Sequence, residues 1–243
     1  MDKSTKMITN ETIRRLLKDV KQIMKHPLTD NGIYYIHDDT DMTKGYAMII
    51  GQKDTIYYGG YYLFSFDYPF DYPFSPPKVA YMTNDGKTRF NPNLYICGKV
   101  CVSILNTWSG EKWSSCQTIN SILLTLCTLL NNEPLLNEPG QKNTSRDYIP
   151  YHKSIQYNNI DYAICDMIIH NKTKNYISQL FYNIMKEQFN INFDNLLTFI
   201  QSQSKEITLE HVGIYNMNTY INYSTLETKL IQTKHFIETD IIN

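Results

Sequence analysis

The spacing of apolar residues changes from a helical period to a period of two near residue 30, and only some folds accommodate that order. Residues 10–25 carry apolar side chains at helical spacing: Ile13, Leu16, Leu17, Val20 and Ile23. His26-Pro27 ends this helix, because the residue before a proline resists the helical region. Four segments with a period of two follow, rich in aromatic and β-branched residues: 32–39, 45–52, 59–68 and 78–83. They predict an antiparallel meander of four strands. Between the last two strands, one bond of the run from Pro73 to Pro77 is expected to be cis.

Helical spacing returns in the second half of the chain. Residues 117–131 and 147–170 each carry a broad apolar face, so both are expected as helices that pack on the sheet. Three further helical candidates follow: 174–189, 193–204 and 223–240. No glycine- or serine-rich linker precedes residues 172–243, which we interpret as a helical C-terminal extension packed on the first domain. The fold class is therefore α+β.

Length and charge exclude several classes of protein. The chain has 243 residues, which allows one domain of about 150 residues plus an extension. Its net charge is −1, whereas a general nucleic-acid binder is normally basic, so no nucleic-acid partner is expected. No stretch approaches the roughly 20 apolar residues that span a bilayer, and the N-terminal segment lacks a continuous apolar run. We therefore expect no membrane partner and no secretory leader.

Five cysteines stand at positions 97, 101, 116, 127 and 165. Their number is odd and no C-x-x-C pair occurs, which disfavours a disulfide framework and a zinc ribbon. Free thiols in a reducing cytoplasmic or nuclear compartment are expected. Cys116, Cys127 and Cys165 fall on apolar faces and are expected in the core. Cys97 and Cys101 would give only two ligands, so no metal site is expected.

Residues 84–113 show no sustained period, although they contain many large apolar side chains. A long irregular segment inside an otherwise regular domain is either functional or disordered. Side chains such as Phe90, Val102, Trp108 and Trp113 argue against disorder. We expect an ordered, packed loop that carries function.

Several motifs stand in a fixed order between residues 59 and 140. GGYYLFSFDYPFDYPFSPPKVAYMT contains two predicted strands joined by a Tyr-Pro-x-x-Pro-Pro loop. RFNPNLYICGKVCVSIL contains Asn91-Pro92-Asn93, and Cys101 is the eighth residue after Asn93; Trp113 and a helix follow. This order resembles the catalytic domain of ubiquitin-conjugating enzymes (E2), where a His-Pro-Asn tripeptide precedes the active-site cysteine at the same spacing. FNPN, the insert NTWSGEKW and NEPG after the helix are similar to larger members with terminal extensions.

The resemblance covers roughly residues 8–171, and it implies a UBC-like domain with an active-site loop after the sheet. It also implies an activity: an E2 accepts ubiquitin or a ubiquitin-like protein from an activating enzyme (E1) as a thioester. It then transfers this protein to lysine, with or without a ligase (E3). ATP is used by the E1, so no bound cofactor is implied.

Cys101 is, by this resemblance, the residue that carries the thioester. A buried structural cysteine is the usual alternative for a single cysteine. Gly98-Lys99 and the ordered loop favour an exposed thiol, and no histidine lies near it in sequence to support a Cys–His protease. The alternative function is an inactive E2-like ubiquitin-binding or scaffold protein, although inactive variants of the family lack the cysteine.

Further site residues follow from the same resemblance. Asn93 either holds the active-site loop by hydrogen bonds or donates its amide to the oxyanion of the tetrahedral intermediate. Asn91 replaces a histidine whose role is mainly structural. Ser103 stands where many members have aspartate. The position that orients the incoming lysine falls on or near Asn137, and Glu138 beside it can supply the charge.

Two surfaces are also implied. Arg15 and Lys18 lie where members of the family use a basic first helix to meet the E1, although an ordinary solvated helix face is a strong alternative. Phe74 and Ser115 match positions in two loops that contact an E3. Ser115 stands where many members have proline, and a phenylalanine beside prolines can equally belong to the core.

Overall fold

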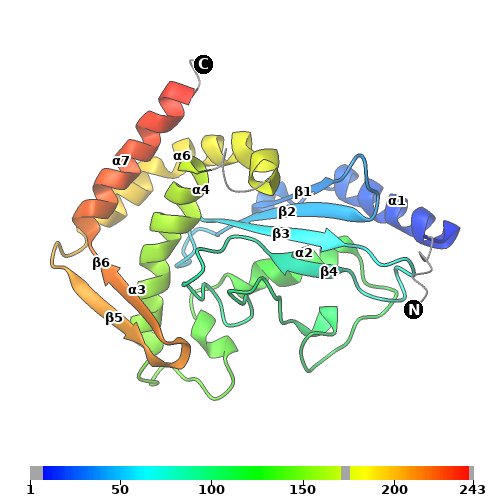
Figure 1. The fold of residues 1–243 in the computed structure, drawn as a ribbon, viewed down its shortest axis with the longest axis horizontal. Helices are drawn as coiled ribbons and strands as arrows, with labels where there is room; N and C mark the ends of the chain where they lie inside the picture. Colours follow the sequence, from blue (N-terminus) through cyan, green and yellow to red (C-terminus); the bar gives the residue numbers. More distant parts are fainter. Residues whose placement is uncertain (1–7, 171–175, 241–243) are drawn as a thin grey trace, which may run out of the picture.

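A four-stranded sheet lies at the centre of the molecule, with helices on both of its faces (Figure 1). This computed structural model describes residues 8–170 and 176–240. The strands are β1 (Ile33–His37), β2 (Lys44–Ile50), β3 (Tyr61–Asp67) and β4 (Lys78–Tyr81), paired antiparallel in the order β1-β2-β3-β4. The predicted meander is confirmed, and the Tyr72-Pro73 bond is cis as expected.

The first face of the sheet packs on helices α1 (Asn10–Lys25) and α2 (Ile119–Leu129). Side chains alternate across a strand, so every second residue of β3 points to this core. Tyr62, Phe64 and Phe66 are all buried there. Helix α2 begins at a capping box in which Thr118 and Ser121 satisfy each other's backbone N–H groups. This core holds the base of the active-site loop.

The second predicted helix of this half contains a π-helical segment. Helix α3 (Tyr148–Asn158) continues through η4 (Asn159–Asp166), which is π-helical, into α4 (Met167–Ile169). Asn159 connects this segment to the sheet: its Oδ1 accepts from Tyr62 Oη at 2.7 Å, and its Nδ2 donates to Tyr58 O at 3.0 Å. A Cβ on Gly60 would lie 1.9 Å from Asn159 Oδ1, so only glycine permits this approach.

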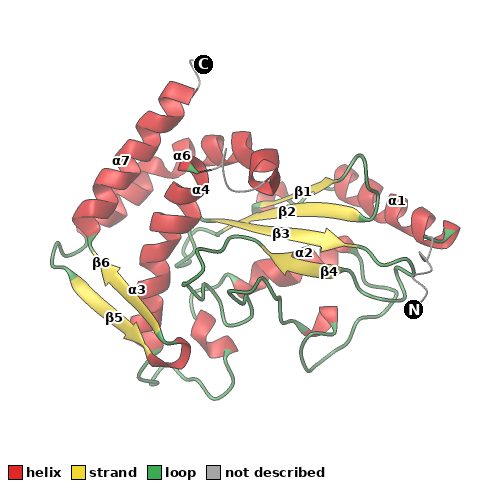
Figure 2. Cartoon of the chain, in the orientation of Figure 1, coloured by secondary structure: helices red, strands yellow, loops and turns green. Residues whose placement is uncertain are grey.

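The C-terminal extension is partly β, and the purely helical prediction for it is wrong. Helix α6 (Tyr176–Ser202) is followed by strands β5 (Thr208–Val212) and β6 (Met217–Ile221) and by helix α7 (Tyr223–Asp240). The hairpin stands apart from the central sheet (Figure 2). The two candidates 174–189 and 193–204 form one helix. Residue 174 and the proposed domain boundary at 171–172 lie outside the described residues.

The extension covers the second face of the sheet, as expected from the absence of a linker. Met48, Tyr61 and Leu63 point away from the first core and are fully buried against side chains of α6, which include Phe181, Met185 and Phe189. Tyr61 Oη donates to the backbone carbonyl of Met185 at 2.8 Å. The extension is therefore part of the folded core.

A chain that ends at Lys172 should be less stable and less soluble than the full-length protein. Its truncation would expose Met48, Tyr61 and Leu63, and full burial of one such side chain contributes roughly 1.5–3 kcal/mol. We expect a clearly lower midpoint in urea unfolding and binding of a hydrophobic dye. An unchanged midpoint would contradict the packing of α6 on the sheet.

Candidate active site

The spacing between Asn93 and Cys101 corresponds to a closed loop. Cys101 N donates to Asn93 O at 2.8 Å, and Asn93 Nδ2 donates back to Cys101 O at 2.7 Å. Between them, Tyr95 N donates to Lys99 O at 2.9 Å, and Gly98 adopts a positive φ of 87° that favours glycine. Three hydrogen bonds therefore fix the cysteine relative to the asparagine.

Asn91 anchors this loop to the first core. Its side chain is completely buried. Nδ2 donates to Leu129 O at the end of α2, at 2.8 Å, and Oδ1 accepts from Asn93 N at 2.9 Å. Tyr57 Oη lies 3.3 Å from the same Nδ2. These contacts tie the tripeptide to the end of α2, and the role that the resemblance implies for Asn91 stays a prediction.

The expected exposure of Cys101 is wrong, because the residue is only 2% exposed. Gly98 and Lys99 lie in the outer part of the turn, but the backbone then leads inward through Val100, which is buried. The exposed thiols are those of Cys97 and Cys116. Cys116 was expected in the core, but it stands in the turn before α2, outside the apolar face of that helix. Cys127, which was also expected in the core, is half-buried.

Cys165 was expected in the core, and this is confirmed. It lies in η4 and is completely buried. Burial disfavours the charged thiolate, which raises the pKa of the Cys165 thiol to about 12. This thiol is therefore not a candidate nucleophile.

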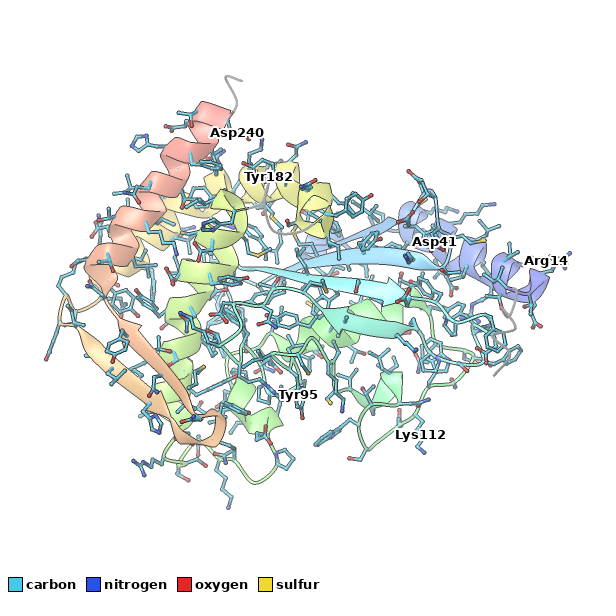
Figure 3. The ribbon with its side chains drawn as sticks, viewed as in Figure 1. Arg14, Asp41, Tyr95, Lys112, Tyr182 and Asp240 are labelled. Atoms are coloured by element: carbon cyan, nitrogen blue, oxygen red, sulfur yellow. The ribbon has the colours of Figure 1, made fainter. Side chains whose placement is uncertain are left out.

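The insert at residues 106–113 folds back onto the residues that directly follow Cys101. Ser103 begins the short helix η2 (Ser103–Leu105) and is half-buried. Thr107 Oγ1 accepts from Val102 N at 3.0 Å, and a Cβ on Gly110 would lie 3.1 Å from Ser103 Cβ. Tyr95 from the turn and Lys112 from the insert lie on the same side of the sheet (Figure 3).

The two lysine-orienting candidates stand at the end of helix η3 (Pro134–Asn137). Asn137 is exposed. Glu138 is half-buried, and its Oε2 accepts from Tyr215 Oη at 2.7 Å. Tyr215 belongs to the short helix η5 (Gly213–Tyr215) between the two hairpin strands. Burial raises the pKa of Tyr215, and the neighbouring carboxylate adds to the effect, so this phenol is a donor.

Arg15 makes internal contacts, contrary to the solvated face that was the alternative for it. Its Nε lies 3.0 Å from Asp19 Oδ1, and its Nη1 donates to Ser115 O at 2.6 Å. Asp19 is only 2% exposed and also accepts from Tyr72 Oη at 2.5 Å. The predicted stripe placed Leu17 inside, but Leu17 is exposed and Asp19 is buried. Lys18 is exposed.

One position predicted to meet an E1, Arg15, contacts one position predicted to meet an E3, Ser115. Arg15 bonds directly to the backbone of Ser115, which is exposed. Phe74 is 63% exposed, so it is not a core residue. The preceding Pro73 accepts at its carbonyl from Trp113 Nε1 at 2.7 Å. The partner roles of these residues stay predictions.

Sequence reasoning missed Asp19, Arg89 and Tyr215. A buried carboxylate in a helix gives no apolar signal, and only the spacing of Arg15 and Asp19 by four residues hinted at a pair. Arg89 stands two residues before Asn91, in the irregular segment where no period helps. Tyr215 lies in a hairpin between two helical candidates, 193–204 and 223–240, where no element was predicted.

Within residues 8–170 and 176–240, no three His, Cys, Asp or Glu side chains gather as a metal site would need. No helix in these ranges is long and apolar enough to span a membrane.

Comparisons with known proteins agree with the fold and the motifs. The family model for ubiquitin-conjugating enzymes matches residues 15–160. The human protein named ubiquitin-conjugating enzyme E2 Z is 43% identical over 161 residues, which is 65% of this chain and 45% of that protein. Its Xenopus tropicalis counterpart is 41% identical over 163 residues, 66% of this chain and 51% of that protein. The match thus spans about half the length of these curated relatives.

A solved structure shows the same fold. It is a crystal structure of a candidate ubiquitin conjugating enzyme from Plasmodium yoelii, with a TM-score of 0.51 and 24% sequence identity. The alignment covers 64% of this chain and 97% of that one.

Replacement of Arg15 by alanine should destabilise the fold, whereas the same replacement of Lys18 should not. Without Arg15, the buried Asp19 carboxylate loses its charged partner, a loss that costs on the order of 3 kcal/mol. Lys18 is exposed, so its loss should change stability by less than about 0.5 kcal/mol. Urea unfolding of the two variants measures the difference, and equal midpoints would show that the Asp19 pair is not structural.

Proposed function

Because this chain belongs to the ubiquitin-conjugating enzyme family, we propose that it is an E2 that carries ubiquitin, or a ubiquitin-like protein, on Cys101. The observation that carries the proposal is the pair of hydrogen bonds between Cys101 and Asn93, within a motif at the family's spacing. No observation favours the inactive alternative, and the cysteine is present.

The chemistry is two successive acyl transfers. The Cys101 thiolate attacks the carbonyl carbon of the E1 thioester, and the E1 thiolate leaves. A thiol suits this exchange because one thioester replaces another. In the second transfer, the amine of a lysine attacks the same carbon. The carbon–sulfur bond breaks, Cys101 leaves as a thiolate, and the proton lost by the nitrogen passes to a base.

Asn93 makes a contact that supports the first of its two proposed roles, and its amide can also serve the second. Its Nδ2 donates one hydrogen to Cys101 O, which holds the loop. An amide nitrogen carries a second hydrogen, which is free to face an oxyanion formed beside the sulfur. We assign Asn91 to support of the loop, and Ser103, Asn137 and Glu138 to the approach of the lysine.

Access to Cys101 requires movement of its surroundings. A cysteine residue that is only 2% exposed offers little of its sulfur to a thioester on another protein. The insert approaches Ser103, two residues after Cys101, and the turn closed by Tyr95 and Lys99 directly precedes the cysteine in the chain. We infer that contact with the E1 opens this surface.

The proposal extends to the partners of this protein and to its cellular compartment. Lys18, with Arg15 beside it, is proposed to face the E1, and Phe74 with Ser115 to face an E3. The protein needs no bound cofactor of its own, because the E1 uses the ATP. A reducing compartment, the cytoplasm or the nucleus, suits a chain with five free thiols.

The thioester should form on Cys101. Incubation of the purified protein with E1, ubiquitin and ATP is expected to give an adduct that a reducing agent cleaves. Cys101→Ser should give at most a reductant-resistant ester, and Cys101→Ala no adduct. Cys97→Ala removes an exposed neighbouring thiol and is the matched control, which should load normally. A normal thioester on Cys101→Ala would overturn the assignment.

Asn93→Ala should separate loading from transfer. The thiol remains, so the variant should still form the thioester. Loss of one oxyanion donor typically reduces rates by ~10²–10³, and we expect a decrease of this order in discharge to free lysine. Single-turnover discharge of the loaded protein measures it. If a folded variant discharges at the normal rate, Asn93 acts only as an anchor of the loop.

A further inference from the structure

We propose that Tyr215 is a positioning residue for lysine transfer, because it connects Glu138 to the guanidinium that holds the active-site loop. This inference rests on the proposed E2 function. It assigns the C-terminal hairpin a part in the second acyl transfer, beyond its part in the core.

Tyr215 restrains Glu138 through its hydroxyl group. Oη donates to Glu138 Oε2 at 2.7 Å. This bond uses Oε2, and we assign the other carboxylate oxygen, Oε1, to the lysine ammonium group. A glutamate side chain has several rotatable bonds, and a fixed donor removes much of that freedom.

The Tyr215 ring is itself fixed. It packs on Tyr151, with ring centroids 5.6 Å apart, and Tyr151 Oη donates to Arg89 O at 2.8 Å. The hairpin turn is anchored by Asp147, whose Oδ1 accepts from Gly213 N at 3.0 Å and whose Oδ2 accepts from Ile214 N at 2.9 Å. The phenol therefore stands at a defined position.

Arg89 links this phenol to the active-site loop. Its guanidinium carbon lies 3.4 Å from the centroid of the Tyr95 ring and 5.4 Å from that of Tyr215. The same group donates from Nε to Asn91 O at 3.1 Å and from Nη2 to Pro92 O at 2.6 Å. Both carbonyls belong to the tripeptide that ends at Asn93. The contacts thus run without a break from Glu138 to the loop that contains Cys101.

This arrangement has a chemical consequence. The ammonium group of a lysine must lose a proton before its nitrogen can attack the thioester carbon, and a carboxylate at a fixed place orients that nitrogen. Tyr215 would then act through Glu138 and Arg89 without touching the reacting atoms. Its hydroxyl group matters for Glu138, and its ring matters for Arg89.

Tyr215→Phe tests the proposal, since it keeps the ring and removes the hydroxyl group. Full-length variants are loaded by E1, and discharge is measured over a range of free lysine concentrations. We expect the KM for lysine to rise about tenfold, the equivalent of one ordinary hydrogen bond, with a smaller change in kcat. Tyr220→Phe is the matched control, because Tyr220 lies in the same hairpin and is 70% exposed. It should discharge like the unchanged protein.

Glu138→Gln gives an independent measurement that leaves Tyr215 in place. It should reproduce the weaker response to lysine, and the double variant should be no worse than Glu138→Gln alone, because both changes act through one carboxylate. A normal KM in a folded Tyr215→Phe variant would overturn the proposal. So would a loss in loading as large as the loss in discharge, which would indicate a general structural defect. Failure of the unchanged protein to load would instead overturn the proposed E2 function.

Discussion

Strand β3 is buried on both faces, so both faces of the sheet need a covering layer from the same chain. Tyr62, Phe64 and Phe66 require the first core, while Tyr61 and Leu63 require the second. The alternation of side chains in a strand leaves no other arrangement. The first core supplies the anchor for Asn91 at the end of α2, and the second is completed by α6. The active-site loop therefore rests on a sheet that the C-terminal extension helps to stabilise.

The family match and the folding unit do not end at the same residue. The match ends at residue 160, inside the π-helical segment η4. Asn159 in this segment connects to Tyr58 and Tyr62, and Ile160 and Ile164 lie in the second core with α6. The part of the chain that is shared with relatives and the part beyond it therefore use the same core.

The regular elements of the fold were predictable from the sequence, because each has a clear period. The four strands follow from segments with a period of two, such as 59–68, and α1 and α2 follow from helical spacing of apolar residues. The cis bond was expected from the proline run. The hairpin was missed although Thr208–Val212 and Met217–Ile221 alternate, because a five-residue strand is too short to outweigh the helical patterns beside it. Burial of Asp19 was not predictable from hydrophobicity, since only its contacts with Arg15 and Tyr72 make it acceptable in the interior.

The candidate site could likewise be predicted only in part. The relation of Asn93 to Cys101 was visible as a spacing, since a closed loop has a fixed length. The depth of Cys101 was not visible, because it depends on how the following insert folds back. Contacts between distant segments leave no local pattern in the sequence. Tyr215 and Glu138, for example, are 77 residues apart along the chain.

The order of the segments along the chain also has a consequence for synthesis. Strand β3 ends at Asp67, but the helix that covers its second face ends only at Ser202. At about 5–20 residues per second, a ribosome needs roughly 7–27 s to make the intervening chain. During this interval α6 does not yet cover Met48, Tyr61 and Leu63, and exposed apolar strands are prone to aggregate. The nascent chain that has completed its sheet but not α6 is thus the form most dependent on chaperones.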